Sequence, residues 1–149
     1  MSVIRYCNPD VVFITPKDSV QEAVELMRYR HVGALVVVEQ HPEGNIPVGM
    51  LTDRDIVIEV LAEGVPVDSV TVGDIMSSEL KTVGEDEEVA EVIRLMCRLG
   101  VRRLPVVDAR NTLRGLITLD DLIRLEAEKI ADLAGLIGRE QQQERRRRP

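Results

Sequence analysis

The sequence Gly49-Met50-Leu51-Thr52-Asp53-Arg54-Asp55 recurs 66 residues later as Gly115-Leu116-Ile117-Thr118-Leu119-Asp120-Asp121. In each copy an apolar run ends in a threonine, and an aspartate follows three residues after that threonine. This spacing is typical of a strand that leads directly into a helix, with the threonine as the helix N-cap. The duplication therefore predicts two equivalent strand-to-helix junctions in one chain.

The repeat extends upstream of both junctions. An earlier set of apolar residues follows the i, i+3, i+4, i+7 spacing of a helix with one buried face, and the set recurs at an offset of 69 residues. The residues are Val20, Ala23, Val24 and Met27 in the first copy and Val89, Val92, Ile93 and Met96 in the second. The offset falls to 66 after the hairpin loop because this loop, 41–45, is shorter in the second copy, 109–111.

Each copy is predicted to run strand, helix, strand, strand, helix. The fold class is therefore α/β (α+β), with two tandem β-α-β-β-α repeats related by a pseudo-twofold axis, because one three-stranded sheet with helices on one face needs a second layer to cover its other face. The predicted strands are 11–14, 34–38, 47–51, 80–83, 104–107 and 113–117, and the predicted helices are 19–30, 53–62, 88–99 and 119–136. The domain boundaries are repeat 1 at 8–63, a linker with a short helical turn at 64–78, repeat 2 with an extended C-terminal helix at 79–137, and a polar, mobile tail at 138–149.

The composition indicates a folded globule and argues against several kinds of function. The chain has 149 residues, 44% of them hydrophobic, and a net charge of −7, so we expect no general nucleic-acid binding, which needs a basic face. We interpret the run 145–148, four arginines, as a solvated end. No apolar stretch approaches the length of a membrane span and the first residues lack a secretory signal, so we expect a cytoplasmic protein with no membrane partner.

Metal and redox chemistry are also not predicted. Cys7 and Cys97 belong to no CxxC pair, and we interpret them as reduced structural thiols. His31 and His41 have no cluster of metal-ligating residues near them in the sequence, so we expect no metal site and no required cofactor.

The two Thr-x-x-Asp motifs admit two interpretations. A threonine and an aspartate at a helix N-terminus lie beside free backbone N–H groups, where a phosphate can bind while the carboxylate accepts hydrogen bonds from a sugar diol. The same residues form a capping box, which satisfies only the donors of the helix itself. Two copies in register favour ligand binding, with capping retained as a second role of each threonine.

The two junction sequences, together with Gly100-Val101-Arg102-Arg103-Leu104-Pro105-Val106-Val107-Asp108 and Val72-Gly73-Asp74-Ile75-Met76, resemble the cystathionine-beta-synthase (CBS) domain family over roughly 9–125. The resemblance implies a stand-alone regulatory module, commonly a homodimer, that binds adenosyl compounds such as AMP, ADP, ATP or S-adenosylmethionine in two clefts between its repeats. It does not select one of these ligands.

The resemblance also implies the residues of each cleft. In the first cleft, Thr52 and Asp55 face the phosphates and the ribose, Leu80 and Lys81 surround the base, and Arg102 or Arg103 lies near the phosphates. In the second cleft, Thr118 and Asp121 act with Val11 and Val12, and Arg54 is the cation. Because Arg102 and Arg103 align with Gly33 and Ala34, we expect tighter binding of a phosphorylated ligand in the first cleft.

Two other functions remain open alternatives. One is a structural, dimerising module with empty clefts. The other is an enzyme that uses Asp55 or Asp121 as acid or base, which the absence of an accompanying nucleophile in the sequence disfavours. The apolar residues that continue to Leu136 predict that the last helix packs either on its own module or on a partner helix in a dimer.

Overall fold

The computed structural model describes residues 1–148 and contains two three-stranded sheets of the same topology, ordered β1-β2-β3 and β4-β5-β6. The first strand of each sheet pairs parallel with the second, and the second pairs antiparallel with the third. The first repeat contains β1 (Phe13–Ile14), α1 (Val20–Arg30), β2 (Ala34–His41), β3 (Gly44–Thr52), α2 (Asp53–Ile56) and the π-helical turn η2 (Val57–Leu61). The second contains β4 (Val83–Gly84), α4 (Val89–Leu99), β5 (Arg103–Val107), β6 (Leu113–Thr118) and α5 (Leu119–Arg147). The predicted tandem-repeat fold is confirmed.

The predicted elements exist, and several of their ends differ. The first strand of each repeat is only two residues long, and the preceding Val12 contributes its carbonyl oxygen, which accepts from Val36 N–H at 3.1 Å. The helix predicted over 53–62 is a short α-helix followed by a π-helical turn. Strands β2 and β3 are longer than predicted because their pairing continues to His41 and Gly44, which leaves a two-residue turn.

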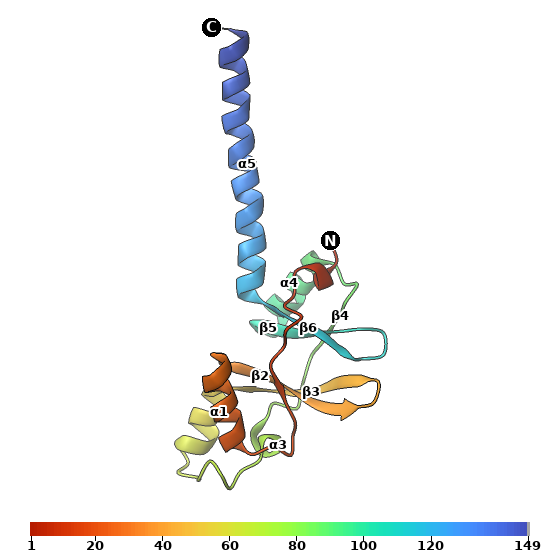
Figure 1. Cartoon of the computed structure of the whole chain (residues 1–149), viewed down its shortest axis with the longest axis vertical. Helices are drawn as coiled ribbons and strands as arrows, with labels where there is room; N and C mark the ends of the chain where they lie inside the picture. Colours follow the sequence, from red (N-terminus) through yellow and green to blue (C-terminus); the bar gives the residue numbers. More distant parts are fainter. Residues whose placement is uncertain (149) are drawn as a thin grey trace.

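The central strand of each sheet has buried side chains on both of its faces. In β2, Leu35 and Val37 belong to the apolar cluster that faces the helices of the first repeat, whereas Val36 and Val38 lie outside this cluster and are fully buried. Successive strand residues point to opposite faces, so Val36 and Val38 face away from those helices. Figure 1 shows the two sheets lying against each other with α1 and α4 on the outer sides. The repeats therefore supply each other's second layer, as the predicted pseudo-twofold packing requires.

Two segments outside the predicted repeat boundaries complete these cores. The turn η1 (Val3–Arg5) belongs to the core of the second repeat, and α3 (Val72–Ile75) belongs to that of the first. Val3 and Val72 are both fully buried, and they are 69 residues apart, the same offset as the repeats. Each repeat thus receives a short helical segment that precedes the other repeat in the sequence. From the sequence, the first repeat was expected to start at residue 8 and 64–78 to be a linker. The place of η1 and α3 in the repeat cores was therefore not predicted.

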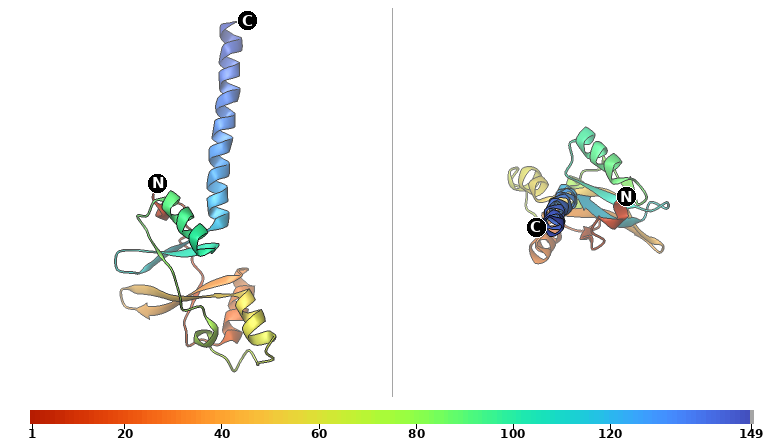
Figure 2. Two further views of the ribbon diagram at one scale, coloured as in Figure 1. Left: turned by 180° about the vertical axis from the view of Figure 1, so that it is seen from behind. Right: turned by 90° about the horizontal axis from the view of Figure 1, so that it is seen from above.

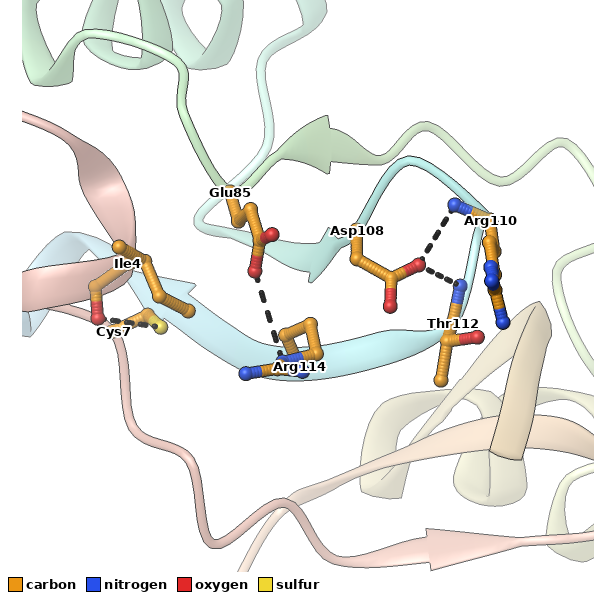
Figure 3. A network of polar contacts seen from close by, with 7 residues as sticks. All are labelled: Ile4, Cys7, Glu85, Asp108, Arg110, Thr112 and Arg114. Carbon is orange, nitrogen blue, oxygen red and sulfur yellow. Dashed lines mark hydrogen bonds and ion pairs between the residues drawn. The ribbon is translucent and has the colours of Figure 1, made fainter. Parts of the chain in front are cut away.

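Glycines on the third strands let these exchanged segments approach the sheets. A Cβ atom at Gly115 would lie 2.5 Å from Cys7 Sγ, and one at Gly49 would lie 2.7 Å from the Ser77 carbonyl oxygen. Figure 3 shows the Cys7 thiol, whose hydrogen bond to the Ile4 carbonyl oxygen measures 3.5 Å, near the ion pair between Arg114 and Glu85 at 3.7 Å. Burial raises the pKa of the Cys7 thiol, which is the behaviour of an unreactive structural thiol.

The C-terminal helix corrects one prediction. It does not end near Leu136: α5 continues to Arg147, so the segment predicted as a separate mobile tail from residue 138 forms its last turns within the described chain. Only Leu122 and Leu125 of α5 are buried, and Figures 1 and 2 show the helix running away from both sheets. α5 therefore does not pack over its own module. Within residues 1–148, every helix is too short or too polar to cross a bilayer.

Candidate functional site

The first Thr-x-x-Asp motif forms the helix cap that its spacing predicts. The Asp55 backbone N–H donates to Thr52 Oγ1 at 3.2 Å, and the Thr52 backbone N–H donates to Asp55 Oδ2 at 2.9 Å. Both side chains are half-buried. The same reciprocal box is present at Ser19, away from the junctions. Its carboxylate half recurs at Thr71, whose backbone N–H donates to Asp74 Oδ2 at 3.0 Å. The motif alone is therefore a general capping device of this chain, and a binding role needs further support.

A cleft of about 870 Å³ provides that support, because it opens beside Thr52 between the two repeats. Five residues predicted for the first site line it together: Thr52, Leu80, Lys81, Arg102 and Arg103. They come from the end of β3, from the segment before β4 and from the start of β5. Asp55 is not among the lining residues. Its Oδ2 accepts from the Thr52 backbone N–H, which leaves Oδ1 as the carboxylate oxygen without a hydrogen bond in residues 1–148.

The charge of this cleft is positive in a chain that is acidic overall. Lys81, Arg102 and Arg103 line it, and Glu79 is the one acidic lining residue. Among residues 1–148, none of these three cations has a carboxylate within ion-pair distance. Unpaired cations in a cleft favour an anionic ligand. The cleft can therefore bind a compound that carries phosphate or another anion.

The second predicted site has no counterpart among the five hollows described, and it stays a prediction. The cleft at Thr52 and four smaller hollows of the described chain are lined by other residues than Thr118, Asp121, Val11, Val12 and Arg54. The repeat offset places Asp10 and Arg30 where Glu79 and Leu99 line the first cleft. Asp10 and Arg30 form an ion pair at 3.1 Å, so this region already contains a paired acid and base.

The two threonines also differ in their hydroxyl groups. Thr118 Oγ1 donates to Asp121 Oδ2 at 2.9 Å, and Asp121 Oδ1 lies 3.7 Å from Arg124. In the described chain, no corresponding hydrogen bond joins Thr52 Oγ1 to Asp55 Oδ2. The Thr52 hydroxyl therefore retains a proton that it can donate to a ligand, whereas the Thr118 hydroxyl proton is already used.

Sequence reasoning missed several residues of the cleft wall. The missed lining residues are Met50, Ser77, Ser78, Glu79, Leu99, Val101, Leu104 and Pro105. The paired serines after Met76 were a usable signal, because small hydroxyl residues in a linker between two repeats can donate to a ligand. Ser77 reaches the cleft because its backbone pairs with Met50, with N–H to carbonyl distances of 2.9 and 3.2 Å.

Residues 1–148 contain no cluster of side chains for metal binding and no disulfide. No group of three His, Cys, Asp or Glu side chains is placed to hold a metal ion in this part of the chain. Cys7 is buried and Cys97 is exposed, and neither forms a disulfide. The cleft at Thr52 is therefore the site on which a functional argument can be built.

Comparison with known proteins agrees with this architecture. The CBS domain profile matches twice, at residues 3–62 and 72–128, and so includes both exchanged segments, η1 and α3. An uncharacterized protein of Methanopyrus kandleri, MK0525, is 37% identical over 133 residues, which cover 89% of this chain and 66% of that protein. The CBS domain-containing protein YhcV of Bacillus subtilis is 38% identical over 112 residues, which cover 75% of this chain and 76% of that protein.

A solved structure gives the same fold. The CBS domain pair of protein MJ0100, in complex with methylthioadenosine and S-adenosyl-L-methionine, superposes with a TM-score of 0.74 at 26% identity. The superposition covers 87% of this chain and 98% of that one. Since the profile matches both repeats over most of the sequence, the chain belongs to the CBS domain family.

Proposed function

We propose that this protein is a regulatory module that binds one adenine nucleotide, AMP, ADP or ATP, in the cleft at Thr52. CBS pairs are regulatory ligand-binding modules, and one structural relative binds two adenosyl compounds. The observation that carries the nucleotide proposal is the set of three unpaired cations, Lys81, Arg102 and Arg103, around one cleft. Methylthioadenosine has no phosphate and needs no such set, whereas a nucleotide does.

The geometry supports a role for each group. Arg102 and Arg103 lie on one side of the cleft and can bind phosphate oxygens through paired N–H donors. Thr52 supplies its free hydroxyl proton at the start of α2. The backbone N–H groups of Asp53 and Arg54 already donate to the Gly33 carbonyl oxygen and to Asp53 Oδ1, so the side chains provide the donors for the phosphate. Leu80, Val101 and Pro105 provide an apolar wall for the adenine. Asp55 Oδ1, which accepts no hydrogen bond within the described chain, is available to the ribose hydroxyls.

The size of the cleft fits this ligand class. Small-molecule sites commonly enclose about 300–1,000 Å³ and combine apolar walls with a few placed polar groups. At about 870 Å³ the cleft accommodates a nucleotide with one or more phosphates. Both repeats contribute to its wall, so a bound nucleotide that favours one relative position of the repeats would shift the conformational equilibrium. A regulatory signal can arise in this way without catalysis.

Thermal unfolding with candidate ligands tests the proposal. We expect AMP, ADP or ATP to raise Tm, because a ligand that binds only the folded state adds about 2.7 kcal/mol of stability at 100 times its Kd. Adenosine and S-adenosyl-L-methionine serve as controls that lack the phosphate anion. A larger shift with either control than with every nucleotide would contradict the nucleotide proposal. If no adenosyl compound changes Tm, the structural module without a ligand becomes the better interpretation.

The Asp55→Ala substitution separates binding from capping. We expect it to weaken nucleotide binding, because it removes the acceptor proposed for the ribose, and to cost only about 0.5–2 kcal/mol of stability through the lost cap. The matched variant is Asp121→Ala, which removes the same cap at the other junction. Isothermal titration of the two variants should show weakened binding only for Asp55→Ala. Equal affinity in both variants would leave Asp55 with a capping role alone.

A further inference from the structure

The outer part of α5 carries apolar side chains that nothing in its own chain covers. The helix has 29 residues, about 43 Å at 1.5 Å per residue, and leaves the module near Leu125 (Figures 1 and 2). Beyond that point Ile130, Leu133 and Ile137 are 66%, 63% and 59% exposed. Single exposed apolar residues are ordinary, but a contiguous set on one element marks an interaction surface.

Two of these residues, Ile130 and Ile137, belong to a regular stripe, and Leu133 flanks it. Ile123, Ala127, Ile130, Ala134 and Ile137 are separated by steps of four, three, four and three residues. This spacing is the a/d pattern of a coiled-coil seam, in which isoleucine occupies one position and alanine the other. We call these five residues the α5 seam. Alanine at every second layer allows two helix backbones to approach closely.

The α5 seam continues onto the module. Three of its residues, Ile123, Ala127 and Ile130, also line a hollow of about 380 Å³ at the base of the helix. The other lining residues are Ile93, Leu119, Leu122 and Glu126. One almost wholly apolar surface therefore extends from α4 to the middle of α5, so a partner can contact the module and the helix together.

The free helix is poorly suited to stand alone in water. Gly135 and Gly138 lie in its exposed half, where a Cβ would meet no neighbouring atom within 4 Å. Glycine weakens a helix interior, and most helices in proteins gain their stability from packing of an apolar face. A helix with these residues and an uncovered seam is better explained by a partner than by intrinsic helix propensity.

We propose that α5 pairs with α5 of a second copy of this chain, in parallel, along the α5 seam. In a parallel pair, a residue that flanks the seam contacts the partner residue five positions further on. If the same register continues past Ile137, Glu140 and Arg145 have this spacing and opposite charge, so two symmetric ion pairs would form just beyond the α5 seam. Parallel pairing also places the two apolar hollows at the same end, next to each other, as an isologous dimer requires.

The charge of the helix disfavours a membrane as the partner. Helices that lie on anionic membranes carry a polar face rich in lysine and arginine. Between Leu119 and Ile137 the polar positions of α5 hold five acidic residues and two basic ones. The basic run 145–148 lies beyond the seam, at the far tip.

Sedimentation velocity on the full chain tests the pairing. We expect the mass of two chains for the unchanged protein across the micromolar range, and a twofold lower mass for the double variant Ile130→Glu/Ile137→Glu. Arg139→Glu, on the opposite face of the same helix, is the control and should stay dimeric. The nucleotide-induced Tm shift should persist in the double variant, because Ile130 and Ile137 are exposed and do not line the cleft. A monomeric unchanged protein, or a double variant that remains dimeric, overturns the proposal.

Cysteine cross-linking tests the orientation independently. Ala134→Cys, in a Cys97→Ser background that removes the exposed native thiol, brings two thiols together only in a parallel seam. We expect a disulfide-linked dimer under mild oxidation, and none from the control Asp132→Cys on the outer face. Equal cross-linking of both variants, or none at position 134, contradicts the parallel arrangement whatever the ligand result.

Discussion

Replacing both Arg102 and Arg103 with alanine is expected to lower the affinity for ATP at least about 100-fold. A hydrogen bond to a charged group contributes about 1.5–3 kcal/mol, and each 1.4 kcal/mol corresponds to a tenfold change in Kd. Both side chains line the cleft, and neither has a carboxylate partner among residues 1–148. Their removal therefore breaks no ion pair within the protein, and the loss of affinity reports on the contacts with the ligand. Isothermal titration at fixed ionic strength measures the change.

The control for this experiment is Arg28→Ala/Arg98→Ala, which removes the same charge from exposed positions on α1 and α4. We expect the control to change Kd by less than about threefold, because neither side chain lines the cleft and salt screens exposed charges. Single substitutions should show smaller losses for AMP than for ATP if both arginines contact phosphates. An Arg102→Ala/Arg103→Ala variant with unchanged ATP affinity would overturn the placement of the phosphates.

Replacing Val72 with aspartate is expected to lower the free energy of unfolding by at least about 4 kcal/mol, which places the substitution among the largest single-residue effects. Val72 is fully buried in the core of the first repeat although it precedes the second repeat in the sequence. A carboxylate there would lose its hydration without gaining a partner. Since small domains have only about 5–15 kcal/mol of stability, urea unfolding should show a large drop in midpoint or an unfolded chain.

Two further variants make this result specific. Val65→Asp lies in the same connecting segment at a position 37% exposed, and we expect a loss below about 1 kcal/mol. Val3→Asp should match Val72→Asp, because Val3 fills the equivalent place in the second repeat. If Val72→Asp were as mild as Val65→Asp, the exchanged segment would contribute little to the core.

The local elements were predictable because their signals lie close together in the sequence. The helix stripes at Val20–Met27 and Val89–Met96 and the capping boxes at Thr52 and Thr118 require only a few neighbouring residues. Five of the residues that the resemblance to the CBS domain family assigned to the first site line one cleft, and their role in binding stays a prediction. The same resemblance did not indicate that the two sets would differ, with the second set absent from the lining of the five hollows described.

The errors arose where a residue's partner is distant or belongs to another layer. The end of α5 was placed too early because a run of polar residues does not reveal whether a helix continues. The first strand of each repeat was predicted too long because only Phe13–Ile14 and Val83–Gly84 pair with the central strands. Asp55 was expected in the cleft wall, yet its carboxylate turns back to the Thr52 backbone, an alternative that the spacing alone could not exclude.

By itself, the sequence determined the duplication, the order of elements in each repeat and the family, because these depend on periodicity and short-range spacing. Only the tertiary structure decided which segment completes which core, that Val3 and Val72 are exchanged between repeats, and that the cations of one cleft remain unpaired while Asp10 and Arg30 neutralise each other near the other. The physical reason is that burial and ion pairing depend on distances between residues far apart in the chain, and those distances are set by the packing of the two repeats.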